Sequence, residues 1–396
     1  MRTLLHRMVS GWPAATCLTL LLTACGGGGG GGDIAGVGSG GTGTISSTVT
    51  VGSISGFGSI IVAGVRYDDT NATVTDEDGA ARSRSDLKLG MVTAITGSAD
   101  FTAATGVAAA IRYGSEIVGP ITGIDVAGAQ LRVLGAVVNI KTSTVFADGL
   151  SGLASLHTGD LVEVFGFYTN GAFTATRIEP KTGVQRYKLR APIEALDTST
   201  KRFTLAGVRI DYSGVPLAAR PTLANGTIVR ASASAGLSGG LWEVDSLGTA
   251  PRATLADGEA KIEGDISAML TATRFVVDGV TVDASSARLN GTPGVGKRVE
   301  AEGRASGGML VAKEVEVDDE GTTDEEAIEI TALITDFDPL TLRFRLRSQL
   351  IDASRPGITF ESGSAADLAN GRKIELKGYY DAASGAVIAR KIHFED

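Results

Sequence analysis

The sequence predicts an all-β protein made of about five tandem small β-barrels, each with at most one short helix, after a signal peptide and a glycine-rich tether. Three observations carry this prediction. Glycine accounts for 54 of the 396 residues while 43% are hydrophobic, apolar and polar residues alternate over short stretches, and one pattern returns at intervals near 70 residues. Because Gly costs about 1 kcal/mol per helical position, a helical bundle is excluded. The apolar fraction excludes disorder of the whole chain.

Residues 1–24 have the features of a bacterial signal peptide. Arg2 and Arg7 precede an apolar run of about 11 residues, which is shorter than the roughly 20 residues of a membrane-spanning helix. Leu22–Ala24 and then Cys25 resemble the bacterial lipobox, which implies cleavage before Cys25 and acylation of that cysteine. Several acyl chains together make membrane anchoring stable. The alternative is an ordinary secretory peptide cleaved near Ala24.

A flexible tether is predicted over residues 25–48. Seven consecutive glycines begin it, and its Gly/Ser/Thr composition cannot bury enough apolar surface to fold. Treated as a random coil, the tether reaches roughly 27 Å from the anchor. Gly26, rather than Asp, follows the cysteine, and by similarity to Gram-negative lipoproteins this indicates an outer-membrane location, with the side of the membrane left open. Cys17 leaves with the signal peptide and Cys25 is acylated, so the mature chain has no thiol for catalysis or for a disulfide.

Five copies of one strand pattern follow the tether. In the first half of each copy two alternating strands flank a turn, which is marked by Gly64, Gly135, Gly207, Gly279 and Ser348. The second half begins at a turn glycine at positions 90, 159, 226, 296 and 371 and continues as a strand and a hairpin. Between the halves lies a helical hint, clearest at Leu150, Leu153 and Leu156. Three strands, a short helix and two more strands are the order of an OB-type barrel.

The repeat spacing divides the chain into five modules. Their predicted ranges are 49–114, 115–183, 184–252, 253–320 and 321–396. The third module is expected to diverge most, because Ala231 and Ser232 stand where the others have a glycine at 97, 166, 303 or 378. The acidic run 318–326 is predicted to be a linker between the fourth and fifth modules.

Modules 1 and 2 resemble a known family. The runs Gly58–Asp68 and Asp86–Val92, together with Val118–Pro120 and Val133–Gly135, are similar to exported bacterial OB-like repeat domains of unknown function. The resemblance covers about residues 50–180, and the other copies agree with it in spacing. It implies an envelope lipoprotein and contributes no catalytic residues.

Few residues of the sequence point to catalysis, a cofactor or a metal. Gly236–Gly240 fits the G-x-S-x-G nucleophile pattern but lies between two strands, where Gly-Gly is typical of a hairpin. After removal of the signal peptide the histidines are His157 and His393, on different modules, and His157 is expected in a surface loop. The cluster Asp76–Gly79 lacks the ligand spacing of a calcium loop, so a solvated hairpin tip is expected. We predict no catalytic residue, no cofactor and no metal site.

A row of basic residues is the first candidate ligand face. Arg343, Arg345 and Arg347 alternate with apolar residues, so a strand would place their guanidinium groups about 6.8 Å apart on one face. The same arrangement occurs at Arg186, Lys188 and Arg190. Such rows can bind a polyanionic polysaccharide. Alternatively, they keep a strand soluble and protect a sheet edge.

Paired aromatic residues are the second candidate. Phe167 and Tyr168 in module 2 and Tyr379 and Tyr380 in module 5 occupy equivalent strand positions. Neighbouring residues of a strand point to opposite faces, so one ring of each pair is expected outside the barrel. An outer ring could stack on a carbohydrate, or it could pack against the next module.

These observations predict a non-enzymatic, lipid-anchored protein of the cell envelope whose modules serve as a spacer or as a binding surface. Its expected partners are the membrane, through the anchor, and a protein or polysaccharide. The net charge of −9 and the aromatic content of 5% argue against a nucleic-acid partner. The alternative is a glycan hydrolase that uses paired carboxylates, or another envelope enzyme, since acidic residues are plentiful.

Overall fold

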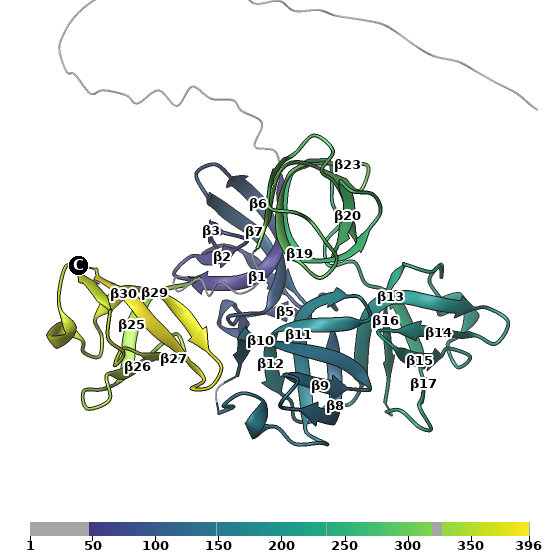
Figure 1. Ribbon diagram of the computed structural model, residues 1–396, viewed down its shortest axis with the longest axis horizontal. Coiled ribbons are helices and arrows are strands. Elements are labelled where there is room, and N and C mark those ends of the chain that lie inside the picture. Colours follow the sequence, from purple (N-terminus) through teal and green to yellow (C-terminus); the bar gives the residue numbers. More distant parts are fainter. Residues whose placement is uncertain (1–46, 148, 235, 319–326, 396) are drawn as a thin grey trace, which may run out of the picture. The chain divides into compact units, whose positions relative to one another are not determined.

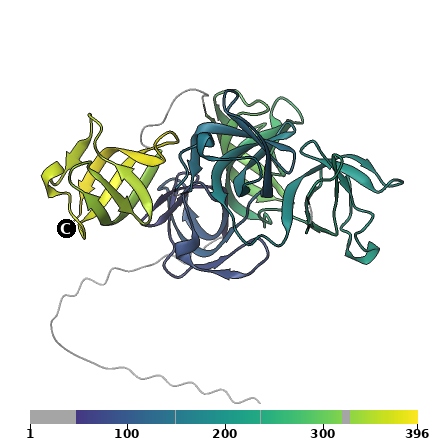
Figure 2. The same ribbon diagram turned by 90° about the horizontal axis from the view of Figure 1, so that it is seen from below.

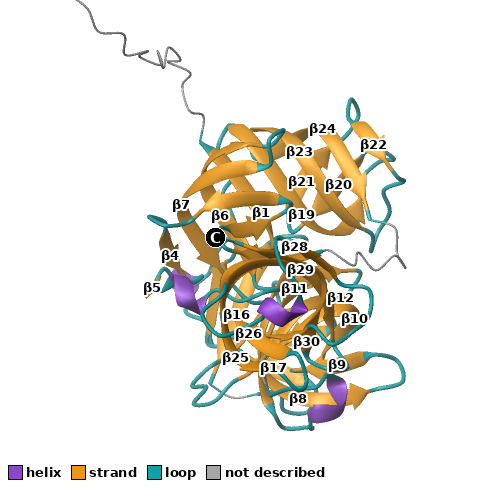
Figure 3. Ribbon diagram, turned by 90° about the vertical axis from the view of Figure 1, so that its left-hand side faces the viewer, coloured by secondary structure: helices purple, strands orange, loops and turns teal. Residues whose placement is uncertain are grey.

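The computed structural model describes residues 47–147, 149–234, 236–318 and 327–395 (Figure 1). The predicted signal peptide, Cys25, nearly all of the tether and residues 319–326 of the acidic linker lie outside the described residues. Strands dominate the described part (Figure 3). Its only helices are four 3₁₀ turns of three residues each. None of these helices has the length and apolar character needed to cross a membrane.

Module 1 is a closed barrel. Its strands are β1 (Thr48–Phe57), β2 (Ile60–Val62), β3 (Val65–Asp68), β4 (Thr73–Thr75), β5 (Ala81–Arg82), β6 (Val92–Asp100) and β7 (Thr105–Tyr113), with the 3₁₀ turn η1 (Arg84–Asp86) before β6. The long strand β1 pairs antiparallel with both β2 and β6, and β3 runs parallel to β7. Hairpins join β2 to β3 and β6 to β7, which closes the barrel in the order expected for an OB-type fold.

Modules 2 and 3 repeat this connectivity. Module 2 contains β8 (Ile117–Asp125), β9 (Gln130–Val133), β10 (Ala136–Phe146), η2 (Leu153–Ser155), β11 (Leu161–Thr169) and β12 (Ala172–Pro180). Module 3 contains β13 (Tyr187–Asp197), β14 (Arg202–Leu205), β15 (Val208–Asp211), η3 (Leu217–Ala219), β16 (Ile228–Ala233), β17 (Leu241–Glu243) and β18 (Ser246–Thr249). The parallel contacts are β10 with β12 and β15 with β17.

Modules 4 and 5 are built in the same way. Module 4 contains β19 (Gly258–Met269), β20 (Arg274–Val277), β21 (Val280–Asp283), β22 (Arg288–Asn290), β23 (Arg298–Ser306) and β24 (Met309–Val317). Module 5 contains β25 (Ile328–Asp338), β26 (Arg343–Leu346), β27 (Gln349–Asp352), β28 (Thr359–Glu361), η4 (Ala365–Asp367), β29 (Lys373–Asp381) and β30 (Ala386–Phe394). The last strand of each module again makes parallel contacts: β24 pairs with β21 and β22, and β30 pairs with β27 and β28. The predicted all-β fold of tandem OB-like barrels is confirmed.

The turns that mark the repeat are two-residue hairpins. In module 1 both turn residues, Ala63 and Gly64, have positive φ angles of 49° and 69°, which is the backbone of a type I′ turn. The equivalent turns at 134–135, 206–207, 278–279 and 347–348 also have positive φ at both positions. Module 5 uses Ser348 at φ 77°, where the other modules have glycine. This non-glycine residue is therefore held in a strained conformation.

A second glycine position shapes the strand before last. Its members are Gly97, Gly166, Gly303 and Gly378, each seven residues after the turn glycine, and the strand pairing shifts register beside each of them. A Cβ atom there would lie 2.0–2.1 Å from a carbonyl oxygen of the last strand. In module 3 the residue seven positions after Gly226 is Ala233, so assigning this place to Ala231 and Ser232 was wrong. The register between β16 and β18 is unbroken from Val229 to Ser232 and does not extend to Ala233, and the last strand is divided into β17 and β18.

The modules are joined by their first strands as well as by the chain. β1 pairs parallel with β19 and with β25, and β8 pairs antiparallel with β13. In both views the strands of one barrel lie together (Figures 1 and 2). Inside the barrels, the isoleucines at 54, 121, 193, 266 and 334 occupy equivalent places in the first strands and are at most 2% exposed. The outer faces of these strands are where neighbouring modules meet.

Candidate functional site

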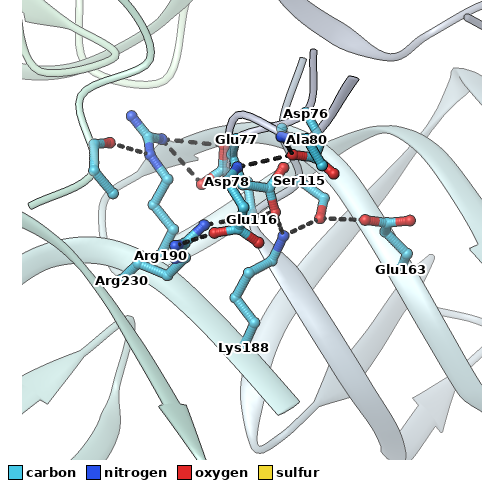
Figure 4. Close-up of polar contacts among 12 residues, drawn as sticks. Asp76, Glu77, Asp78, Ala80, Ser115, Glu116, Glu163, Lys188, Arg190 and Arg230 are labelled. Atoms are coloured by element: carbon cyan, nitrogen blue, oxygen red, sulfur yellow. Dashed lines mark hydrogen bonds and ion pairs between the residues drawn. The ribbon is translucent and has the colours of Figure 1, made fainter. Parts of the chain in front are cut away.

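A group of polar side chains lies where modules 1, 2 and 3 meet (Figure 4). Lys188 of β13 donates hydrogen bonds to the carboxylate of Glu77 and, at 2.6 Å, to the hydroxyl of Ser115. Ser115 donates in turn to Glu163 at 2.6 Å, and Lys181 binds Glu163 at 2.5 Å. One chain of charged and polar groups therefore runs through all three modules.

Asp76 fixes the loop that presents Glu77. One oxygen of Asp76 accepts hydrogen bonds from the backbone of Asp78 and Ala80, both at 3.0 Å, and the other accepts from Arg82 at 2.6 Å. Burial opposes ionisation, but the bonds from Arg82 and Ala80 outweigh it and lower the pKa of Asp76. The cluster Asp76–Gly79 is a hairpin tip between β4 and β5, as expected, but only part of it is solvated: Asp78 and Gly79 are exposed, whereas Asp76 is buried and Glu77 contacts Lys188. Asp78 also pairs with Arg230 of module 3.

Two carboxylates stand opposite each other on β11 and β12. Glu163 and Glu179 are partners in the strand register, and Lys181 lies 2.5 Å from the first and 3.8 Å from the second. Burial alone would lower the pKa of Lys181, but Glu163 raises it, so this lysine stays charged. Arg177 also pairs with Glu179 at 2.6 Å. Cations therefore hold both carboxylates.

A cleft of about 770 Å³ opens beside this chain of groups. Its acidic lining residues are Asp76, Glu77, Asp78, Asp86, Glu163 and Glu179. Its basic lining residues are Arg82, Lys88, Lys181, Arg186, Lys188 and Arg230. Tyr113 and Tyr187, both part-exposed, also line it, and burial raises the pKa of Tyr113 to about 12. The cleft thus combines equal numbers of opposite charges with two phenol rings.

Four further charged side chains form a buried network. Glu116, whose side chain is 0% exposed, binds Arg190 at 3.1 Å and also pairs with Arg252. Asp278 binds the same two arginines, at 3.0 and 2.7 Å. Burial would raise the pKa of Asp278, but Arg190 and Arg252 lower it. Because the four residues come from module 2, module 3, the segment after β18 and the hairpin turn of module 4, the network ties these parts together.

The basic row of module 5 is only partly built as predicted. Strand β26 ends at Leu346, so Arg343 and Arg345 share a strand face while Arg347 lies in the hairpin turn. Arg343 pairs with Asp352 at 2.9 Å, and Arg345 donates to the carbonyl oxygen of Ser348. The guanidinium of Arg347 stacks on the ring of Phe57 of module 1, 4.4 Å from its centroid, and burial lowers its pKa. The prediction of three guanidinium groups in a row on one strand face is therefore wrong.

The basic row at the start of module 3 serves the junction. Arg186 is exposed and pairs with Asp245, whereas Lys188 and Arg190 are buried in the contacts described above. These two residues join modules rather than forming an exposed ligand face.

The aromatic pairs each have one buried and one part-exposed ring. Phe167 is 1% exposed and lies under the guanidinium of Arg298 of module 4, while Tyr168 donates its hydroxyl hydrogen to Glu194. Tyr380 is buried, and its hydroxyl accepts from the backbone N–H of Phe146 in module 2 at 3.0 Å. Tyr379 is part-exposed under Arg390, 5.2 Å from its ring centroid. Phe167 and Tyr380 thus pack against other modules, and a ligand role for Tyr168 and Tyr379 stays a prediction.

The other chemical motifs have structural roles in the described residues. Ser238 and Leu241 form a two-residue hairpin around Gly239 and Gly240, as expected from the sequence. The side chain of His157 is 80% exposed, as expected for a surface loop. Within the residues that the structure describes, no three His, Cys, Asp or Glu side chains gather in a way that could hold a metal ion.

Three segments of the chain match one protein family. Residues 118–179, 263–316 and 330–393 match a family described as a domain of unknown function (DUF5666). The matches fall in modules 2, 4 and 5, so the chain contains tandem repeats of an uncharacterised domain. The resemblance read from residues 50–180 holds from residue 118 onward, and module 1 lies outside the matched segments.

The remaining comparisons are weaker. No curated protein matches the chain. A solved structure titled Drosophila Unr CSD456 is 12% identical and covers 52% of this chain and 98% of its own, with a TM-score of 0.16. A likeness at that TM-score carries no argument about fold or function.

Proposed function

We propose that the chain is a non-enzymatic, lipid-anchored protein of the cell envelope whose tandem barrels form a spacer and a binding surface for a protein or glycan. The observation that carries the proposal is the buried network of Glu116, Arg190, Arg252 and Asp278. The network joins modules 2, 3 and 4. Strand pairing of β1 with β19 and β25 joins module 1 to modules 4 and 5, and pairing of β8 with β13 joins modules 2 and 3. Modules kept in contact suit a part that must hold a binding surface at a set distance from a membrane.

The N-terminal sequence supports the anchor. Leu22–Ala24 and Cys25 fit a lipobox, and the glycine-rich segment after them gives the reach that a spacer requires. We expect palmitate label to enter the wild-type chain in a Gram-negative host and globomycin to leave the precursor unprocessed. The variant Cys25→Ala is expected to lose the label and to leave the membrane fraction. A Cys25→Ala chain that stays fully membrane-bound would refute the anchor.

A carboxylate-based glycan hydrolase is the second candidate. It is favoured by one observation, the placement of Glu163 opposite Glu179 beside the cleft. Lys181 and Arg177 hold these two carboxylates, which favours a structural role for them. Incubation with a glycan array followed by product analysis separates the two functions. Retention without products supports binding, and products that disappear in Glu163→Gln support the hydrolase.

A further inference from the structure

The cleft between modules 1, 2 and 3 has the dimensions of a ligand site. Its volume of about 770 Å³ lies within the roughly 300–1,000 Å³ typical of small-molecule sites. Asp76–Asp78 come from module 1, Glu163 and Lys181 from module 2, and Tyr187 and Lys188 from module 3. The site therefore requires all three modules in contact.

The charges of the cleft favour a neutral ligand. Of its six acidic and six basic side chains, all but Asp86 and Lys88 are in ion pairs within the protein. Asp86 accepts a hydrogen bond from the backbone of Ser83, and Lys88 donates one to Ser348. Because ten of the twelve charged groups already have a partner of opposite sign and the two signs balance, the cleft offers a charged ligand no excess of counter-charge to offset the cost of removing that ligand from water. A ligand without charge avoids this cost.

Hydroxyl groups match the remaining hydrogen-bonding capacity. A carboxylate has about four acceptor sites and an ammonium has three donors, so Glu163 and Lys188 can each bind a further polar group while keeping their ion pairs. A sugar hydroxyl can donate a hydrogen bond to a carboxylate and accept one from an ammonium group. The phenol rings of Tyr113 and Tyr187 add apolar faces with a polar tip. Such rings suit the faces of a pyranose.

We propose that this cleft binds a neutral oligosaccharide, with the sugar rings against Tyr113 and Tyr187 and the hydroxyls along Lys188 and Glu163. The proposal rests on the proposed function, for which it names the class of ligand and the place where the ligand binds. It differs from the polyanion expected from the basic rows, because the cleft has no excess of positive charge.

The test measures binding to the full-length chain purified in detergent. The neutral probes are N-acetylated chitohexaose, cellohexaose and maltohexaose, and the charged probes are hexagalacturonate and fully deacetylated chitohexaose, measured by calorimetry. We expect at least one neutral probe to bind and both charged probes to bind more weakly. Tyr187→Ala is expected to weaken binding about tenfold, while the matched control Phe101→Ala, at a part-exposed aromatic residue outside the cleft, changes it less than about twofold. Tyr379→Ala tests the other candidate ring, which also lies outside the cleft. Glu163→Gln, which keeps the shape of the side chain, is a second test if Tyr187→Ala does not fold.

Each other outcome counts against a specific step. If no neutral probe binds, or if a charged probe binds most tightly, the cleft proposal is overturned. If Tyr379→Ala weakens binding and Tyr187→Ala does not, the cleft proposal fails while the proposed binding function stands on another face. If a neutral probe binds in the cleft and is cleaved, the cleft proposal stands and the non-enzymatic function fails.

Discussion

Replacing Asp265 by Asn should stabilise the protein at neutral pH. Asp265 lies in β19 between modules 4 and 2, its side chain is 0% exposed, and neither carboxylate oxygen accepts a hydrogen bond from the described residues. The nearest guanidinium nitrogen, on Arg298, is 3.8 Å away, and Arg298 is already bound to Glu263. The other modules place Ser53, Pro120, Pro192 and Leu333 at the equivalent position before the core isoleucine. The barrel therefore does not need a carboxylate there.

The pH dependence of this effect has a definite sign. Burial raises the pKa of Asp265, and the attraction of Arg298 and the nearby hydroxyl of Thr174 oppose but do not cancel the rise. Between the pKa of the unfolded chain and the higher pKa of the folded chain, the folded chain binds more protons. The free energy of unfolding therefore falls as the pH rises through that window, and above it the full cost of the ionised group is present. Asp265→Asn removes this dependence.

The size of the effect follows from the missing hydrogen bonds. A buried polar group left unsatisfied costs about 1–3 kcal/mol, and more when it is charged. The amide of Asn still needs partners, so we expect a net gain on the order of 1–2 kcal/mol at pH 7.5, measured by urea unfolding of the full chain. At a pH below the unfolded pKa of about 3.9 the carboxyl group is protonated in both the folded and the unfolded chain. The difference in unfolding free energy between the wild type and the variant should then be smaller than this gain.

Asp283→Asn is a matched control in the same module. The hydrogen bonds from Arg274 and from Ser285 lower the pKa of Asp283 to about 2. Its contribution to stability is therefore present above the unfolded pKa and is lost as the pH falls through the folded pKa, so this variant should be less stable at pH 7.5. An Asp265→Asn chain that is less stable than the wild type at pH 7.5, or that keeps the wild-type pH dependence, would show that the carboxylate is needed where it lies.

Three further changes test the fold and the junction. Gly166→Ala should cost about 1–3 kcal/mol in urea unfolding, because its Cβ would meet the carbonyl oxygen of Thr174 at 2.1 Å, whereas Gly248→Ala, with open space around it, should change little. Ser348→Gly should raise the unfolding free energy by about 1 kcal/mol by removing left-handed strain, and an unchanged value would contradict the strain. Glu116→Gln should cost about 3–5 kcal/mol, because two buried arginines would then have to share the carboxylate of Asp278. Asp245→Asn, which breaks the exposed ion pair with Arg186, should cost less than about 1 kcal/mol. Equal losses of stability in Glu116→Gln and Asp245→Asn would argue against the network.

The repeated part of the fold could be predicted because it depends on local backbone geometry. Gly64 and its equivalents mark type I′ turns, a conformation that needs positive φ at both positions and so selects glycine. The spacing of these glycines therefore gives the number and order of the barrels. The helical hint was weaker, because of Leu150, Leu153 and Leu156 only Leu153 lies within the three-residue 3₁₀ turn there. The fold could thus be predicted from turns and hairpins, in which residues that contact each other are also close in the sequence.

The candidate site could not be predicted in the same way. Alternation in β13 shows that Leu189 faces the barrel interior and that Lys188 and Arg190 face outward. It does not show whether the outer face meets water or another module, because that depends on partners such as Glu77 and Glu116, which lie 111 and 74 residues away. The turn residue Asp278 carried a local signal, since Asp-Gly is typical of a type I′ turn, but nothing local indicated its buried arginine partners.

The outward positions of the first strands explain how five similar barrels can have fixed neighbours. Five residues before each core isoleucine stand Val49, Glu116, Lys188, Lys261 and Glu329. Glu116 pairs with Arg190 of module 3, Lys188 with Glu77 of module 1, and Glu329 with Arg66 of module 1. Since the barrel interiors are alike, apolar packing alone would allow several orders of assembly. Like charges brought together in a wrong order would be repelled, so the outer charges specify which modules meet, and with them the place of the cleft.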